Sequence, residues 1–227
     1  MNGENGPGPD SGLLAALGSG EYSDLRKRGA VRSFTRATAL FHQGQASDRV
    51  LLILSGYVKL SSFSPDGREV VLAIRGPGDL IGELGVIDER PRSATAITLE
   101  QMSALVVRGP QFKAFLIDHP DVTIRIISML SARLRDADQK RVEFTAQGSL
   151  SRVAARLLEL AERFGGPVEN GVRIELPISQ EELGGWTGCS RDSVVKALQA
   201  MRDLGWIETQ RKQITVYDPE ALRRQVG

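Results

Sequence analysis

The segment GDLIGELGVIDERPRSATA, residues 78–96, holds the side chains whose types and spacing best suit chemistry. Glu83 stands among glycines, the pair Arg92-Ser93 follows nine residues later, and apolar strand-like runs flank both sides. A phosphate monoanion taken out of water needs a charge-assisted partner such as Arg92. Backbone N–H groups of residues 82–84 can point at the same anion, because glycine permits a close approach. The pattern indicates an anion-binding site beside a carboxylate; a Glu83–Arg92 ion pair that satisfies itself is the structural alternative.

A second constellation lies in ISQEELGGWTGCSRDSVVKALQAMRDLGW, residues 178–206. Ser179 and Glu182 form a capping box, which predicts a short helix over residues 180–186. A glycine then supplies the turn, and Ser190 offers the N-cap of a second helix that should end just before the next glycine. Two helices joined by a short glycine-containing turn predict a helix-turn-helix.

The second of these helices has an apolar face and a polar face at helical spacing. Arg191, Asp192 and Lys196 fall on the polar face near its N-terminus. Arginine presents a two-pronged donor to guanine, aspartate accepts from cytosine N4, and lysine reaches guanine or a phosphate. A hairpin is expected to follow, with Arg211 and Lys212 at a tip that can contact the phosphate backbone. The clustering favours DNA binding over a helical hairpin with a solvated face.

Composition bounds the remaining function classes. The chain has 227 residues, of which 41% are hydrophobic, enough for two modest domains. Its net charge is +1, and residues 147–227 hold 11 Lys+Arg and 11 Asp+Glu, so no overall field points to nucleic acid or membrane. The single Cys189 excludes an intramolecular disulfide and fits a reducing cytosol. We expect a cytoplasmic protein without a membrane span, a metal site or a catalytic constellation.

Short apolar runs alternate with glycine-containing turns over residues 31–107. Their nearly regular spacing predicts a β-roll, barrel or sandwich. Pro65-Asp66-Gly67 predicts a hairpin turn between two of the strands. A short helix is expected over residues 111–117, and the polar residues 1–12, rich in glycine and proline, predict a disordered tail.

A long helix is expected to begin at Asp118 or Asp121 and to reach about Phe144. At 1.5 Å per residue it would extend roughly 36 Å, beyond a domain of this size. Side chains recur along it at alternating spacings of three and four, which indicates a heptad seam: Ile127, Leu130, Leu134, Ala137, Arg141 and Phe144. The seam predicts homodimerisation; the alternative is a helix that covers only its own domain. A further amphipathic helix is expected over residues 149–164.

Together these motifs resemble the cyclic-AMP receptor protein (CRP/FNR) family of bacterial transcription regulators. The resemblance rests on ILSGYVKL (53–60), the phosphate-binding cassette IGELGVIDERPRSA (81–94), the long helix, GCSRDSVVKALQAM (188–201) and ITVYD (214–218), in that order. It implies an α+β fold: a cyclic-nucleotide-binding β-roll over 13–117, a dimerisation helix over 118–146 and a winged helix-turn-helix over 147–227.

The resemblance also implies roles for single residues. Glu83 would accept a hydrogen bond from the ribose 2′-hydroxyl of a cyclic nucleotide, Arg92 would pair with the cyclic phosphate, and Ser93 would add a hydroxyl contact. The expected nucleotide-binding set is Gly82, Glu83, Leu84, Arg92, Ser93, Ala94 and Asp138, and the expected DNA-binding set is Ser190, Arg191, Asp192, Lys196, Arg211 and Lys212.

The chain departs from the family pattern where the long helix would meet the base. Cyclic-AMP-responsive members present a Thr-Ser or Thr-Asn pair there, and this chain has Ala137-Asp138. Ala137 cannot hydrogen-bond a base edge, whereas Asp138 can accept from the adenine amino group or from guanine N1–H and N2–H. Cyclic AMP is the first expected effector, with cyclic GMP or cyclic di-GMP as alternatives.

We therefore expect a homodimeric transcription regulator that binds a palindromic operator on double-stranded DNA, is controlled by a cyclic nucleotide and contacts RNA polymerase. A DNA-binding protein of the same shape that works without nucleotide is one alternative. A cyclic-nucleotide module that controls a partner protein, with a vestigial helix-turn-helix, is another. An enzyme is the least supported class.

Overall fold

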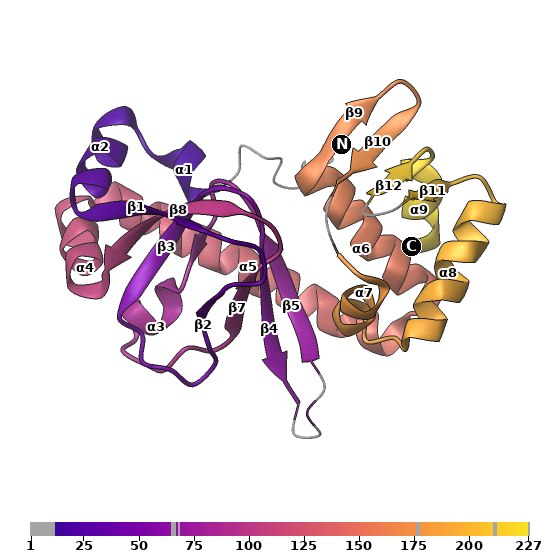
Figure 1. Ribbon diagram of the computed structural model, residues 1–227, viewed down its shortest axis with the longest axis horizontal. Helices are drawn as coiled ribbons and strands as arrows, with labels where there is room; N and C mark the ends of the chain where they lie inside the picture. Colours follow the sequence, from indigo (N-terminus) through magenta and orange to yellow (C-terminus); the bar gives the residue numbers. More distant parts are fainter. Residues whose placement is uncertain (1–11, 65–66, 68, 176–177, 211–212, 227) are drawn as a thin grey trace. The chain divides into compact units, whose positions relative to one another are not determined.

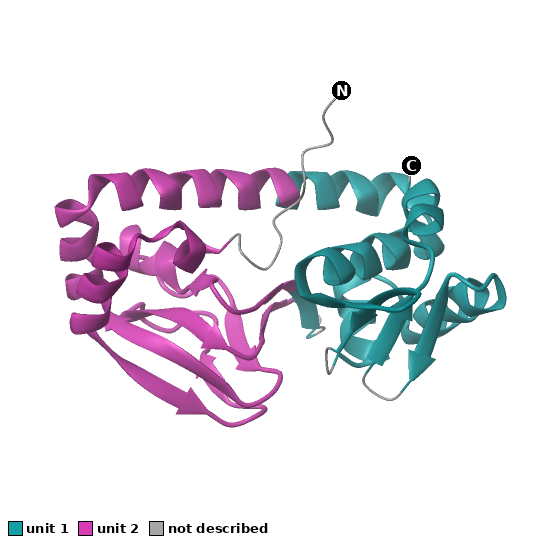
Figure 2. Cartoon of the chain, turned by 90° about the horizontal axis from the view of Figure 1, so that it is seen from above, with its two compact units in different colours: residues 1–8, 64–71, 137–227 teal, residues 9–63, 72–136 magenta. Residues whose placement is uncertain are grey.

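The computed structural model describes residues 12–64, 67, 69–175, 178–210 and 213–226 (Figure 1). The chain divides into two compact units, one with residues 9–63 and 72–136 and the other with residues 64–71 and 137–227 (Figure 2). The turn residues Pro65 and Asp66, the hairpin tip Arg211-Lys212 and nearly all of the predicted tail lie outside the described residues.

Two antiparallel sheets form the body of the N-terminal unit, apart from the first residues of β5, which fall in the other unit. The first has the order β1 (Gly29–Phe34), β8 (Met102–Arg108), β3 (Arg49–Ser55) and β6 (Leu80–Ile81). The second has the order β2 (Ala39–Phe41), β7 (Thr95–Thr98), β4 (Val58–Phe63) and β5 (Glu69–Arg75). Strands β4 and β5 are neighbours, as expected for runs joined by a hairpin.

Strand β3 explains why its sequence is continuously apolar rather than alternating. Successive side chains of a strand point to opposite faces. Val50 and Leu52 join one hydrophobic core, whereas Leu51 and Ile53 join the other. Strand β3 is therefore buried on both faces, and a strand buried in this way carries no polar alternation.

Five helices accompany the sheets: α1 (Leu13–Ala16), α2 (Ser19–Lys27), α3 (Glu83–Ile87), α4 (Gly109–Asp118) and the start of α5 (Pro120–Ala146). The core under them includes Leu25, Phe112, Phe115, Val122 and Ile126. Helix α4 begins two residues before the predicted start, since Pro110 is tolerated in a first helical turn. Helices α1 and α2 were not predicted from the sequence.

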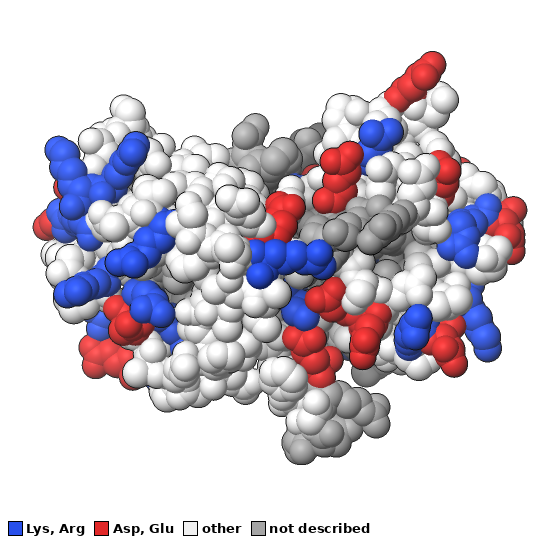
Figure 3. Space-filling model, viewed as in Figure 1, with Lys and Arg blue, Asp and Glu red and all other residues white. Residues whose placement is uncertain are grey.

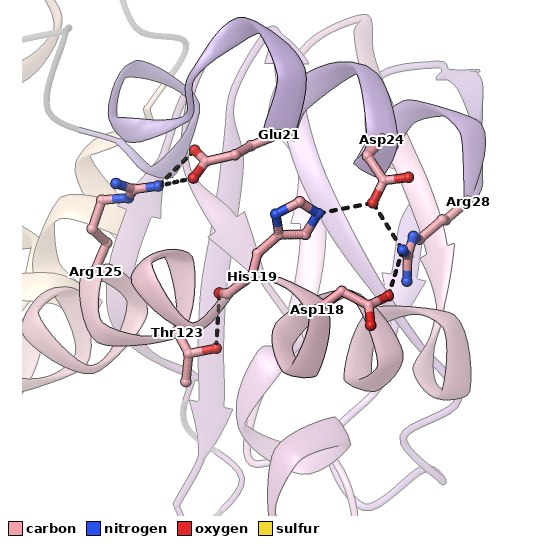
Figure 4. A network of polar contacts seen from close by, with 7 residues as sticks. All are labelled: Glu21, Asp24, Arg28, Asp118, His119, Thr123 and Arg125. Carbon is pink, nitrogen blue, oxygen red and sulfur yellow. Dashed lines mark hydrogen bonds and ion pairs between the residues drawn. The ribbon is translucent and has the colours of Figure 1, made fainter.

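A polar network fastens α2 to the junction of α4 and α5 (Figure 4). The Asp24 carboxylate accepts from His119 Nε2 at 2.9 Å, and Arg28 lies 2.8 Å from Asp24 and 2.7 Å from Asp118. The hydrogen bond from His119 holds the pKa of Asp24 below its ordinary value. The network fixes the place at which the long helix begins.

The C-terminal unit holds the remaining helices and a third antiparallel sheet. The helices are α6 (Ser149–Phe164), α7 (Gln180–Thr187), α8 (Arg191–Asp203) and α9 (Pro219–Val226). The sheet has the order β11 (Ile207–Gln210), β12 (Gln213–Val216), β10 (Gly171–Ile174) and β9 (Gly165–Val168). Strand β9 and helix α9 were not predicted.

These elements confirm the predicted α+β fold with an N-terminal β-roll, a long helix and a C-terminal winged helix-turn-helix. Helix α6 has the predicted bounds, and α5 ends at Ala146, which is the end of the expected dimerisation helix and two residues past Phe144. None of the described helices is both long and apolar enough to cross a membrane.

Candidate functional site

A left-handed glycine places the first turn of the cassette, residues 81–94. Gly82 has φ 79° and stands at the N-cap of α3. A Cβ atom added to it would lie 2.5 Å from Arg92 Nη1. Only glycine avoids both the unfavourable backbone angle and this overlap. Gly82 therefore lets the Arg92 guanidinium lie close to the backbone at the start of α3.

Glu83 is almost fully buried, with 3% of its surface exposed. Its carboxylate accepts from Arg133 Nη1 of α5 at 2.7 Å. Arg133 also donates to the carbonyl oxygen of Leu80 at 3.0 Å, which fixes the fork of its guanidinium. The alternative of a Glu83–Arg92 pair that satisfies itself does not hold, because Arg133 takes the place next to the carboxylate.

Sequence reasoning missed Arg133 as a member of the site. It lies 50 residues from Glu83 and one position from Leu134 of the predicted seam. The only signal in the sequence was that an arginine one position from an apolar seam has to meet an acidic group or solvent. The tertiary structure supplies that partner.

Arg92 is buried as well, with 4% of its surface exposed. Its guanidinium donates to the carbonyl oxygens of Gly82 at 2.8 Å and Arg49 at 2.7 Å. The nearest carboxylate is that of Asp48, at 3.4 Å and largely exposed. Nε has no hydrogen-bond partner among the described residues. Burial lowers the pKa of Arg92, so the charge is incompletely compensated and an anion would stabilise it.

The other predicted nucleotide-binding residues differ in exposure. Leu84 and Ser93 are exposed beside the buried charges, and Ala94 is buried. Asp138 belongs to α5 within the second compact unit, where its side chain is exposed. Contacts of these four with a nucleotide stay predictions.

The helix-turn-helix has the predicted caps and turn. Ser179 Oγ accepts from the backbone N–H of Glu182 at 3.1 Å, and the Glu182 carboxylate accepts from Ser179 N at 2.8 Å. Gly188 has φ 62° in the turn, and Ser190 Oγ accepts from Ser193 N at 3.2 Å at the start of α8. Both helices therefore begin where their local hydrogen bonds dictate.

Helix α8 presents the predicted faces. Val194, Leu198 and Met201 are buried. The opposite face is exposed and carries Arg191, Asp192, Val195, Lys196 and Gln199. The structure thus leaves a mixed polar face free at the N-terminal half of α8, the part of such a helix that reads base edges. Arg211 and Lys212 lie outside the described residues.

A buried ionic cluster joins the end of α5 to the helix-turn-helix. Arg156 of α6 has 6% of its surface exposed and lies 2.6 Å from Glu143 and 2.5 Å from Glu159. Lys140 of α5 lies 3.3 Å from Glu159, and its ammonium is 5.8 Å from the ring centre of Trp186. The last turns of α5 therefore belong to the same compact unit as α7 and α8.

Most of the predicted seam on α5 is exposed in the single chain. Ile127 is 53%, Leu134 64% and Phe144 43% exposed. Leu130 is partly buried against the core of the N-terminal unit, and Ala137 is exposed. Large apolar side chains left in water along one helix mark a surface for another apolar surface.

We predict that Glu83 and Arg133 are energetically coupled. A double-mutant cycle with Glu83→Gln and Arg133→Gln should give a coupling of about 1–3 kcal/mol, because the pair is largely shielded from water. Urea unfolding of the four proteins measures it. In the control cycle, Arg92→Gln replaces Arg133→Gln and should give less than half that coupling. Equal coupling in both cycles would contradict the assigned partners.

Comparison with known proteins agrees with this geometry. Residues 31–119 match the model of the cyclic nucleotide-binding domain, and residues 151–225 match the Crp-like helix-turn-helix domain. The chain is 32% identical over 214 residues to a CRP-like cAMP-activated global transcriptional regulator of Mycobacterium tuberculosis, which covers 94% of this chain and 96% of that protein.

Two solved structures share the fold. FixK2 from Bradyrhizobium japonicum aligns with a TM-score of 0.78 and 21% identity, over 88% of this chain and 98% of that one. The c-di-GMP responsive regulator CLP of Xanthomonas campestris aligns with a TM-score of 0.75 and 22% identity, over 88% and 99%. With the cassette, the long helix and the helix-turn-helix in place, the chain belongs to the CRP/FNR family of DNA-binding transcriptional regulators.

Proposed function

We propose that this chain is a homodimeric, sequence-specific transcription regulator whose cassette binds a cyclic nucleotide, with cyclic AMP as the first candidate. The observation that carries the proposal is the buried Arg92, whose short hydrogen bonds go to neutral carbonyl oxygens. A buried cation is stable when an opposite charge is close. A cyclic phosphate carries one negative charge and would complete the compensation.

The identity of the nucleotide is proposed from relatives and from residues together. The Mycobacterium tuberculosis relative is described as cAMP-activated, whereas CLP is described as c-di-GMP responsive. Asp138 can accept from the amino group of adenine or from two N–H groups of guanine. The alternative is a regulator that answers to cyclic GMP or cyclic di-GMP, or one that binds DNA without nucleotide.

The ion pair of Glu83 with Arg133 suggests how binding reaches the long helix. A ribose hydroxyl that donates to the Glu83 carboxylate competes with Arg133 for its oxygens. Arg133 lies on α5, so a change in this pair acts on the helix that carries the seam. By linkage, a nucleotide that strengthens DNA binding is itself held more tightly when DNA is bound.

We predict that one of cyclic AMP, cyclic GMP and cyclic di-GMP binds the purified, nucleotide-free protein with micromolar affinity in calorimetry. Arg92→Ala should abolish the heat, since it removes the cation that meets the phosphate. Arg90→Ala is the matched control, because Arg90 is an exposed arginine of the same cassette. No heat with any nucleotide, in protein shown to be folded, would leave the DNA-binding regulator without nucleotide as the better proposal.

The exposed seam supports the homodimer. Two copies of α5 side by side would bury the large apolar side chains that one chain leaves in water. Because the last turns of α5 share a compact unit with α8, pairing the helices also pairs the two reading helices. A two-fold symmetric operator is the expected target of such a dimer.

We predict that Leu134→Asp yields a monomer at concentrations where the unchanged protein is a dimer. A charge buried in the seam costs several kcal/mol unless it is paired. Val142→Asp is the control, since Val142 is 58% exposed on the same helix but lies off the seam. Sedimentation velocity measures both. A dimer that survives Leu134→Asp and falls apart in Val142→Asp would place the interface on another face.

The exposed face of α8 is proposed to read DNA in the major groove. Arg191, Asp192 and Lys196 would contact base edges, with the cap residue Ser190 and the hairpin residues Arg211 and Lys212 at phosphates. We further propose that the regulator acts in the cytoplasm and contacts RNA polymerase.

We predict that Arg191→Ala weakens binding to an operator selected from random DNA by about 1–3 kcal/mol and relaxes base preference at one position of each half-site. Arg224→Ala is the control, because Arg224 is an exposed arginine of α9 outside the helix-turn-helix. Fluorescence anisotropy on matched and single-mismatch duplexes measures both effects. Equal losses for the two variants would indicate that Arg191 acts only through its charge.

A further inference from the structure

A groove lined by arginines lies in the N-terminal unit, outside the cassette. Four arginines line it, from the end of α2 and from β1, β3 and β8, together with a single acidic residue: Arg28, Arg32, Arg49, Arg108 and Asp48. Its volume is about 730 Å³. Figure 3 shows Lys and Arg side chains gathered over the surface that β1, α2 and α4 occupy in Figure 1.

Strand register forces two of these arginines together. Arg49 of β3 and Arg108 of β8 are direct cross-strand partners. Like charges in this position destabilise a sheet, since the side chains of opposite residues lie about 5 Å apart. Arg32 of β1 lies on the same face of the sheet. Ala30 pairs with Val106, and alternate residues of a strand share a face, so Arg32 lies with Ala30 and Arg108 lies with Val106. The sheet holds these cations together against their own repulsion.

Compensation of the four charges is incomplete. Arg28 is paired with Asp24 and Asp118, and Arg49 lies 3.4 Å from Asp48. Arg32 and Arg108 are exposed and have no ion-pair or hydrogen-bond partner among the residues that the structure describes. The groove therefore offers two free guanidinium groups beside two engaged ones, and its unmet charge is positive.

Apolar side chains line the groove together with the arginines, and they are called its floor here: Phe34, Leu40, Leu51 and Val106. Leu40 and Leu51 belong to the core between the two sheets, so this floor is fixed by packing. A concave site of several hundred Å³ with an apolar floor and a few polar groups suits a small organic molecule better than a flat protein surface.

We propose that this groove binds an organic polyphosphate, a molecule with an apolar or aromatic body and two or more linked phosphates. Guanidinium groups match phosphate oxygens with paired hydrogen bonds. A single anion cannot neutralise cations on three adjacent strands, whereas a chain of phosphates carries a charge to each. The apolar floor holds the body of the molecule. The site uses neither Glu83 nor the Arg92 side chain.

Calorimetry of the full-length protein tests the proposal with three probes: ATP, tripolyphosphate and adenosine. We expect ATP to bind, tripolyphosphate to bind at least several-fold more weakly because it leaves the floor empty, and adenosine not to bind. Saturating cyclic AMP is present in all titrations, so that an occupied cassette cannot account for the heat.

The double variant Arg32→Gln/Arg108→Gln should weaken ATP binding at least about tenfold, which is the effect of a lost charge-assisted contact. Arg36→Gln, a change of an exposed arginine outside the groove, should alter the Kd by less than about twofold. The double variant remains folded, because removing Arg108 relieves the repulsion with Arg49, and its Tm should not fall.

Three outcomes would overturn the proposal. If ATP binds the double variant as tightly as it binds the unchanged protein, then ATP binds at a site other than this groove. Tripolyphosphate that binds as tightly as ATP shows that the floor contributes nothing. If the protein binds neither ATP nor tripolyphosphate, the groove is better explained as a docking surface for an acidic macromolecule.

Discussion

The ion pair between Glu83 and Arg133 joins the cassette to the long helix, and the geometry of the N-terminal unit depends on it. Both charges are largely removed from water, so each is stable only while the other and its hydrogen bonds stay in place. Arg133 also donates to the carbonyl oxygen of Leu80, the first residue of β6. One guanidinium thus fixes the strand before the cassette, the first residue of α3 and the face of α5 that meets them.

Arg92 is also a charge removed from water, but its partners compensate it less completely. Its short bonds go to carbonyl oxygens, its contact with the exposed Asp48 carboxylate is longer, at 3.4 Å, and its cation lies 4.4 Å from the ring centre of Phe41. These contacts hold the side chain in position and compensate its charge only in part. The two arginines of the site are therefore compensated differently. Arg133 lies 2.7 Å from the Glu83 carboxylate, whereas Arg92 has only the longer contact with Asp48.

In the C-terminal unit, a buried arginine with two carboxylates fixes the end of α5 against α6. Arg156, with Glu143 and Glu159, makes the last turns of α5 part of the helix-turn-helix unit. Removing one member would leave the others buried and unpaired, which is costly. Helix α5 therefore takes part in an ion pair with the cassette at its middle and in a buried ion cluster with α6 near its C-terminal end.

Local signals in the sequence determined α7 and α8 of the C-terminal unit, whereas β9 and α9 were not predicted. The capping box at Ser179, the cap at Ser190 and the left-handed Gly188 act within four residues, so both helices could be predicted, and α8 with its faces. The residue types and spacing in the cassette likewise predicted Glu83 and Arg92 as members of one site. Tertiary structure alone decided their partners, the docking of α2 through Asp24 and His119, and the opposition of Arg49 to Arg108. Each of these depends on segments brought together from far apart in the chain, and the energy that selects them comes from burial and strand register rather than from neighbours in sequence.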